Sequence, residues 1–155
     1  MFKIERGQST VEFTLVAVLL FGLLFALIDF GALFFVNLTM QNAVRAATRH
    51  AVTQSNLAPN GDRMAALIQS IKDNSYGLYD KNKHNPKDPT VRVITPSNVT
   101  FTNYSGTPST GLGDPGQVIE VKLTYTWPLM TPILQPLFPN GYTFTVKTTM
   151  TNEPF

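Results

Sequence analysis

The first third of the chain contains one long apolar run. Between residues 13 and 38 the only polar side chains are Thr14, Asp29 and Asn37. A bilayer core about 30 Å thick is crossed by roughly 20 helical residues at about 1.5 Å each. A helix buried in a soluble core is usually shorter and carries a polar stripe, and the apolar stretch of a cleaved signal peptide is only about 7–15 residues long. The run therefore predicts a transmembrane helix over about residues 13–38.

The helical pattern continues beyond the apolar run. Residues 39–52 contain neither Pro nor Gly, and small and apolar side chains recur there at helical spacing, at Met40, Ala43, Val44, Ala47 and Ala51. Arg45 and Arg49 fall on other faces. We expect one continuous helix from about Ser9 to about Thr53, whose second half projects from the membrane as an amphipathic stalk. The segment containing Pro59 and Gly61 ends it.

The rest of the chain has the pattern of a small β domain that begins with a short helix. Residues 62–71 place Met64, Leu67, Ile68 and Ile71 on one helical face, with Gly61 or Asp62 as the N-cap. Three strand patterns follow, over residues 90–104, 118–127 and 142–152. The first is interrupted at Pro96, which predicts either an edge strand with a break or two short strands. The second alternates cleanly, with Ile119, Val121, Leu123, Tyr125 and Trp127 on one side and Glu120, Lys122, Thr124 and Thr126 on the other. The fold class is α+β, with the long N-terminal helix packed on a small antiparallel β-sheet.

Composition excludes several functions. The net charge is +2, with basic residues scattered, so nucleic acid is not an expected partner. The chain has no cysteine, which excludes disulfides and thiolate chemistry. His50 and His84 are the only histidines and form no metal-binding motif, and no glycine-rich phosphate loop is present. We expect no enzymatic activity, no cofactor and no metal ion.

Two carboxylates flank or interrupt the apolar run. Glu12 precedes it directly, and Asp29 lies about two-thirds of the way along it. A charge deep in a membrane costs at least about 2.5–3.5 kcal/mol. Glu12 can be explained by its place at the start of a helix, where the helix dipole favours an acid. Asp29 lies near the far interface or is protonated in lipid, but neither explanation accounts for two such residues.

The beginning of the chain resembles the processing site of a type IV prepilin. A short basic leader ends in Arg6-Gly7, and Glu12-Phe13 then occupy the fifth and sixth positions counted from Gln8. More narrowly, the first third resembles the TadE-like pseudopilins of the tight-adherence (Tad, or Flp) pilus. The motifs that match in order are Arg6-Gly7, Val11-Glu12-Phe13, Asp29-Phe30-Gly31, Phe34-Phe35, Gln41-Asn42-Ala43 and the segment from Arg45 to Ala51.

The resemblance implies a pilin-like organisation. Residues 1–7 would be a leader that a prepilin peptidase removes after Gly7, residues 8–54 the long helix, and residues 55–155 an extracytoplasmic α+β domain. Cleavage would free the amine of Gln8. The carboxylate of Glu12, next to Phe13, would then pair with the N-terminal amine of the same or a neighbouring subunit. From its depth alone, we further expect Asp29 to contact a partner helix within the membrane.

The segment over residues 128–139 is unusually apolar for a loop. It includes Leu134, Leu137 and Phe138, although loops normally run through water. Two interpretations remain open: the segment covers the core of its own domain, or it contacts the membrane surface or a partner.

These observations predict a structural minor pilin or pseudopilin. We expect a single-pass protein of the bacterial inner membrane, with a cytoplasmic N-terminus and a periplasmic domain. Its partners would be the prepilin peptidase, other pilin subunits and the pilus assembly platform. The alternative is a membrane-anchored periplasmic binding module that never enters a pilus. An enzyme with a signal anchor is a third possibility.

Overall fold

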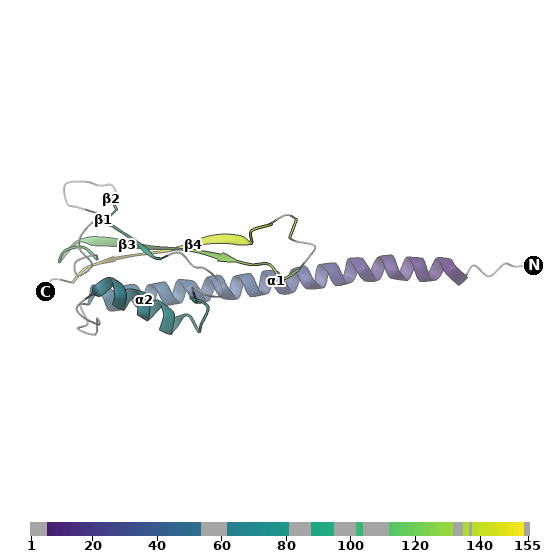
Figure 1. Cartoon of the computed structure of the whole chain (residues 1–155), viewed down its shortest axis with the longest axis horizontal. Helices are drawn as coiled ribbons and strands as arrows, with labels where there is room; N and C mark the ends of the chain where they lie inside the picture. Colours follow the sequence, from purple (N-terminus) through teal and green to yellow (C-terminus); the bar gives the residue numbers. More distant parts are fainter. Residues whose placement is uncertain are drawn as a thin grey trace, which may run out of the picture.

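A single helix runs along the whole molecule. The computed structural model describes residues 6–53, 62–80, 88–94, 102–103, 112–131, 135–136 and 138–153. Helix α1 (Arg6–Val52) has 47 residues, which is about 70 Å at 1.5 Å per residue. Figure 1 shows that its N-terminal half projects alone, whereas its C-terminal half lies along the rest of the chain. One uninterrupted helix was predicted, and its observed ends lie within three residues of the expected ones.

The sheet has four antiparallel strands in the order β2-β1-β3-β4. Their bounds are β1 (Thr90–Ile94), β2 (Thr102–Asn103), β3 (Val118–Trp127) and β4 (Tyr142–Thr151). The longest pairing joins β3 and β4 over their full lengths, from Val118 opposite Thr151 to Trp127 opposite Tyr142. The pattern over residues 90–104 therefore forms two short strands, one of the two predicted alternatives. The predicted α+β class is confirmed.

The core lies between the sheet and the C-terminal half of α1. The predicted inward face of β3 is fully confirmed, because Ile119, Val121, Leu123, Tyr125 and Trp127 are all buried. From α1 the core receives Val36, Met40, Ala43, Val44 and Ala47, all buried. Burial of each large apolar side chain contributes about 1.5–3 kcal/mol. The two alanines add little area, but their small size lets the sheet approach the helix closely.

The outward face of the sheet is polar, with one exception to the predicted exposure. Threonine hydroxyls pair across β3 and β4, with Thr126 and Thr143 at 2.9 Å. Glu120 was expected on this solvated face, but it is buried. The reason is Arg92, its direct cross-strand neighbour on β1, whose guanidinium lies 3.3 Å from the Glu120 carboxylate and covers it.

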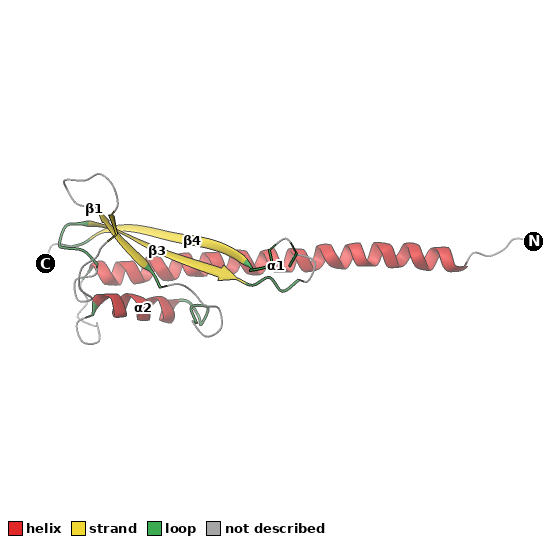
Figure 2. Ribbon diagram, turned by 45° about the horizontal axis from the view of Figure 1, so that its top comes forward, coloured by secondary structure: helices red, strands yellow, loops and turns green. Residues whose placement is uncertain are grey.

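The second helix, α2 (Arg63–Asn74), lies alongside α1 (Figure 2). Asp62 is its N-cap and accepts hydrogen bonds from the amides of Met64 (2.9 Å) and Ala65 (3.2 Å), as one of the predicted caps. The chain after α2 is joined to the sheet by the Tyr125 hydroxyl, which donates to the carbonyl of Leu78 at 2.7 Å. Burial raises the pKa of Tyr125 to about 12, so this donor keeps its proton at neutral pH.

Gly141, at the end of the β3–β4 connection, can be tested against Gly116, which lies just before β3. Both have a positive φ, 79° and 75°, where a side chain costs about 1–2 kcal/mol. A Cβ at Gly116 would meet nothing, whereas at Gly141 it would collide with the Trp127 carbonyl. We expect Gly116→Ala to lower the free energy of unfolding by about 1–2 kcal/mol and Gly141→Ala to lower it clearly more. Thermal unfolding followed by the near-ultraviolet signal of Trp127 measures both, and equal losses would contradict this backbone geometry.

Candidate functional site: the apolar helix and its contact with the domain

Most of the N-terminal half of α1 is exposed in the described structure. No side chain between residues 7 and 28 is buried, and the exposed ones are mainly Leu, Phe and Val. In the part of the chain that the structure describes, α1 is the one helix long and apolar enough to cross a membrane, with a mean hydropathy of 2.6 over its most apolar window. A surface this apolar is stable in lipid or against other apolar helices, not in water.

The residues predicted for processing and assembly lie together at the start of this helix. Gly7, Gln8, Glu12 and Phe13 are all exposed. The Gln8 side-chain amide donates to the Glu12 carboxylate at 3.0 Å, because residues four apart lie on the same helical face. The geometry thus places the acid one turn from the residue that would carry the new amine. Cleavage and the amine pairing themselves stay predictions.

Asp29 is held by a loop from the far end of the sequence. Only 3% of its surface is exposed. Its two carboxylate oxygens accept hydrogen bonds from the backbone amides of Met130 (3.3 Å) and Thr131 (2.8 Å). The Thr131 hydroxyl also donates to the carbonyl of Phe25 at 3.3 Å. We call these four residues the helix–loop contact.

The helix–loop contact gives the intramembrane carboxylate a partner that the sequence did not reveal. Hydrogen bonds to a charged group contribute about 1.5–3 kcal/mol each. The two amides of the chain therefore offset much of the cost of burying the Asp29 carboxylate. The donors are backbone amides about one hundred residues away, and residue types carry no signal for such a pairing. The expected contact between Asp29 and a partner helix stays a prediction, and any such partner would meet a carboxylate that is already covered.

The connection between β3 and β4 presents apolar side chains at this end of the domain. Of the three residues singled out in it, Leu134 and Leu137 lie outside the described residues. Phe138 is 37% exposed, and its ring contacts Tyr142 edge to face at 5.9 Å. Met130 is 73% exposed. Phe138 and Met130 therefore project from the domain and are not part of its buried core.

The outer face of α1, turned away from the domain, changes character along its length. Leu27, Phe30, Phe34, Phe35 and Leu38 are exposed. After Leu38 all the exposed positions of the helix, on whichever side they lie, are polar or charged, namely Gln41, Asn42, Arg45, Arg49 and His50. The apolar surface of the helix thus extends beyond Asp29 on the side that the domain leaves open.

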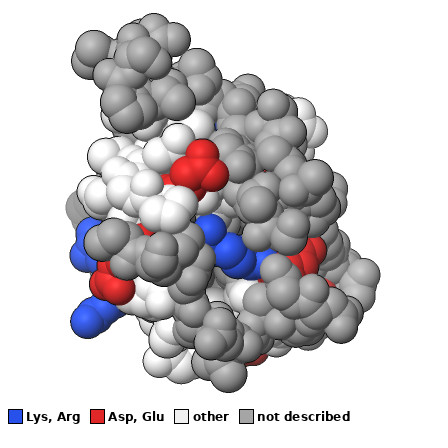
Figure 3. Space-filling view, turned by 90° about the vertical axis from the view of Figure 1, so that its left-hand side faces the viewer, with Lys and Arg blue, Asp and Glu red and all other residues white. Residues whose placement is uncertain are grey.

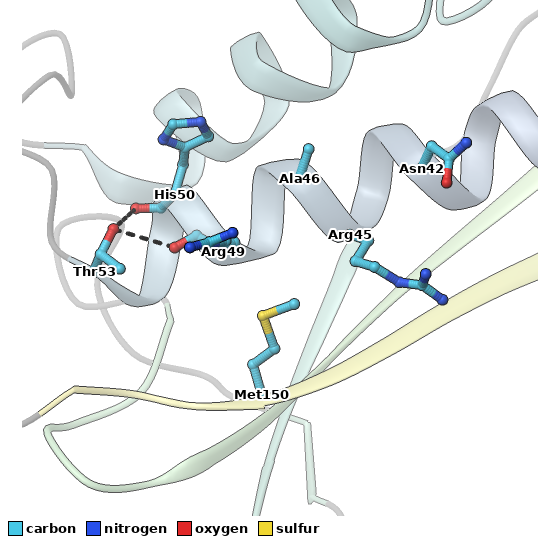
Figure 4. A pocket seen from close by; sticks show the side chains of 7 residues that line it. All are labelled: Asn42, Arg45, Ala46, Arg49, His50, Thr53 and Met150. Carbon is cyan, nitrogen blue, oxygen red and sulfur yellow. Dashed lines mark hydrogen bonds between the residues drawn. The ribbon is translucent and has the colours of Figure 1, made fainter.

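A shallow basic pocket lies further along the same helix. Its volume is about 720 Å³, and its lining includes Arg45, Arg49 and His50 of α1 and Met150 of β4. Figure 4 shows Arg45 and Met150 on the side of α1 that faces β4, with His50 on the other side of the helix. Seen from the end of the molecule opposite the N-terminus, acidic and basic side chains are interspersed among the described residues (Figure 3). No group of three His, Asp or Glu side chains among those residues is placed to bind a metal.

The fold and this site define a class of protein: a small α+β domain carried on one long helix whose free half is suited to a membrane. Residues 7–49 match the family model of TadE-like proteins. The match covers the helix from the predicted cleavage site almost to its end, and it confirms the resemblance found in the sequence. The matched segment is thus similar to TadE-like proteins, and it lies on the helix that is long and apolar enough to cross a membrane. Comparisons with curated proteins and with solved structures gave no match.

Asp29→Asn tests the helix–loop contact. An asparagine keeps the shape but presents one amide NH₂ group to the backbone donors, so at least one hydrogen bond is lost. A loss of about 1.5–3 kcal/mol corresponds to roughly ten- to a hundredfold faster local opening. Hydrogen exchange of the Met130 and Thr131 amides in the full chain measures this change. Glu12→Gln, at the other end of the apolar segment, is the matched control and should leave these amides unchanged. Unaltered exchange in Asp29→Asn would show that the contact does not hold the loop.

Proposed function

We propose that the protein is a structural minor pilin or pseudopilin of the Tad pilus, inserted in the inner membrane by α1. The observation that carries the proposal is the TadE-like match over residues 7–49, which falls on a helix whose first half is bare and apolar. In this role the chain acts by helix packing and not by catalysis. Its N-terminus lies in the cytoplasm and its sheet domain in the periplasm.

Processing after Gly7 would create the charge pair that assembly uses. The new ammonium group of Gln8 and the Glu12 carboxylate lie one helical turn apart, and the existing hydrogen bond between their side chains supports this proximity. In a medium of low dielectric constant two opposite charges attract strongly, and each is costly alone. An amine that pairs with Glu12 of a neighbouring subunit would also fix the relative height of two helices.

The outer face of α1 supports packing against other subunits. Phe30, Phe34 and Leu38 are exposed there and continue the apolar surface of the bare half. Gly31 lies among them, and a Cβ at its position would meet none of the described residues within 4 Å. Since a glycine costs a helix about 1 kcal/mol relative to alanine, and none of the described residues packs there, close approach of a second helix would explain it.

Cleavage distinguishes a pilin from a permanently anchored binding module. Co-expression with a prepilin peptidase should shorten the product by residues 1–7, as seen in its intact mass. Gly7→Val should abolish the shift, while Ser9→Ala, just beyond the cut, should leave it intact. An uncleaved wild-type chain alongside a cleaved prepilin control would favour the binding module.

Glu12→Gln tests the pairing step separately from processing. The variant should be cleaved and inserted normally, because neither step needs the charge. Its recovery with other pilus subunits should fall at least about tenfold, since loss of about 1.4 kcal/mol or more changes an equilibrium by that factor. Thr14→Ser, a conservative change just beyond the acid, is the control. Normal co-purification of Glu12→Gln would rule out the amine pairing.

A further inference from the structure

The helix–loop contact lies at the level where the bare part of α1 ends. Residues 7–28 carry no buried side chain, and Asp29 is the first buried residue of the helix. Seventeen positions separate Glu12 from Asp29, or about 26 Å along the helix axis. The hydrocarbon core of a bilayer is about 30 Å thick. The two carboxylates therefore bracket a segment that nearly matches the apolar thickness of a membrane.

The described parts of the β3–β4 connection lie at the end of the domain nearest to the bare half of α1 (Figure 1). Three side chains of this end are exposed although they are apolar or aromatic: Met130 (73%), Phe138 (37%) and Tyr142 (41%). The backbone at Met130 is held against α1, because its amide and that of Thr131 both donate to Asp29. Aromatic rings with a polar group, such as tyrosine, are enriched where lipid headgroups meet the hydrocarbon.

We propose that Met130, Phe138 and Tyr142, at this end of the domain, rest on the outer leaflet of the bilayer, with the helix–loop contact at the headgroups and the hydrocarbon core ending near Ile28. The inference rests on the membrane insertion proposed above and adds a second contact between the chain and the lipid. It places the outer boundary about ten residues before the predicted end at residue 38. Asp29 then lies at an interface, where its hydrogen-bonded charge is tolerated.

Lipid is favoured over a protein partner at these exposed residues because they are continuous with the apolar surface of α1. The exposed residues of the connection adjoin the segment of α1 that itself requires lipid, so a bilayer that covers the helix up to Ile28 necessarily reaches the loop bound to Asp29. Phe34, Phe35 and Leu38 then lie beyond the hydrocarbon, on the face that the proposed function assigns to other subunits. A domain held at two points has a fixed tilt, which a domain on a free stalk lacks.

Single nitroxide labels can test this arrangement, because the chain has no cysteine of its own. Met130→Cys, Leu20→Cys and Thr151→Cys would each be labelled in the full chain and placed, at one copy per disc, in phosphatidylcholine nanodiscs. All three side chains are exposed, so the label should be accommodated. The measurement is the collision rate of each label with oxygen, which concentrates in lipid, and with a water-soluble nickel chelate.

The three labels have distinct expected results. The label at Leu20 should collide mainly with oxygen, and the label at Thr151, at the far end of β4, mainly with nickel. The label at Met130 should lie between them, and Asp29→Asn should shift it towards the values of Thr151. A Met130 label as open to nickel as that at Thr151 would overturn the inference. A label as protected as that at Leu20 would also overturn it, by placing the loop inside the hydrocarbon.

The same experiment separates failure of this inference from failure of the proposed function. If the Leu20 label collides with nickel as readily as the Thr151 label, α1 does not enter the bilayer and both proposals fall. If Leu20 is protected and Met130 is not, the membrane helix stands and only the resting surface is wrong. Because each disc holds one copy, a second subunit cannot be what protects Met130.

Discussion

The contact between the domain and the apolar part of α1 depends on the hydrogen bonds that the Asp29 carboxylate accepts. An acid within an apolar helix is costly unless donors surround it, and here the donors are the amides of Met130 and Thr131. The residue that interrupts the apolar run is thus bound by the segment that follows β3, at the end of the domain nearest to the free part of the helix. Its burial divides α1 into a free segment and a segment that carries the domain.

The second half of α1 contacts the core of the domain on one side and the surroundings of the molecule on the other. Its inner face supplies Met40, Val44 and Ala47 to the core, while its exposed side chains are apolar as far as Leu38 and polar or basic beyond it. A helix with one face buried in its own domain needs only one apolar stripe. The second stripe is therefore available to lipid or to neighbouring subunits, which is what a component of a helical assembly requires.

Much of this architecture follows from residue patterns, and the part that does not has a clear physical reason. Hydropathy, together with the lack of Pro and Gly over residues 39–52, predicted α1, and strict alternation predicted the buried face of β3, because both patterns are local. Glu120 was predicted to be exposed but is buried, because the side chain of Arg92, on another strand, covers it. The partners of Asp29 could not be predicted because they are backbone amides. Every residue except proline carries such an amide, so the residue types give no sign of which ones bind the carboxylate. Glu12, Gln8 and Gly7 were found through a motif, and the structure adds their exposure and the short distance between the Gln8 and Glu12 side chains.

The ten-residue pairing of β3 with β4 has a mechanical consequence. The two strands run roughly along the axis of α1 (Figures 1 and 2), and the hydrogen bonds between antiparallel strands lie perpendicular to the strands. Where a pulling force along the helix acts on the two strands at opposite ends, it loads this ladder in shear, so that its bonds have to rupture together and not one after another. The domain is oriented to resist traction along the direction in which its helix points.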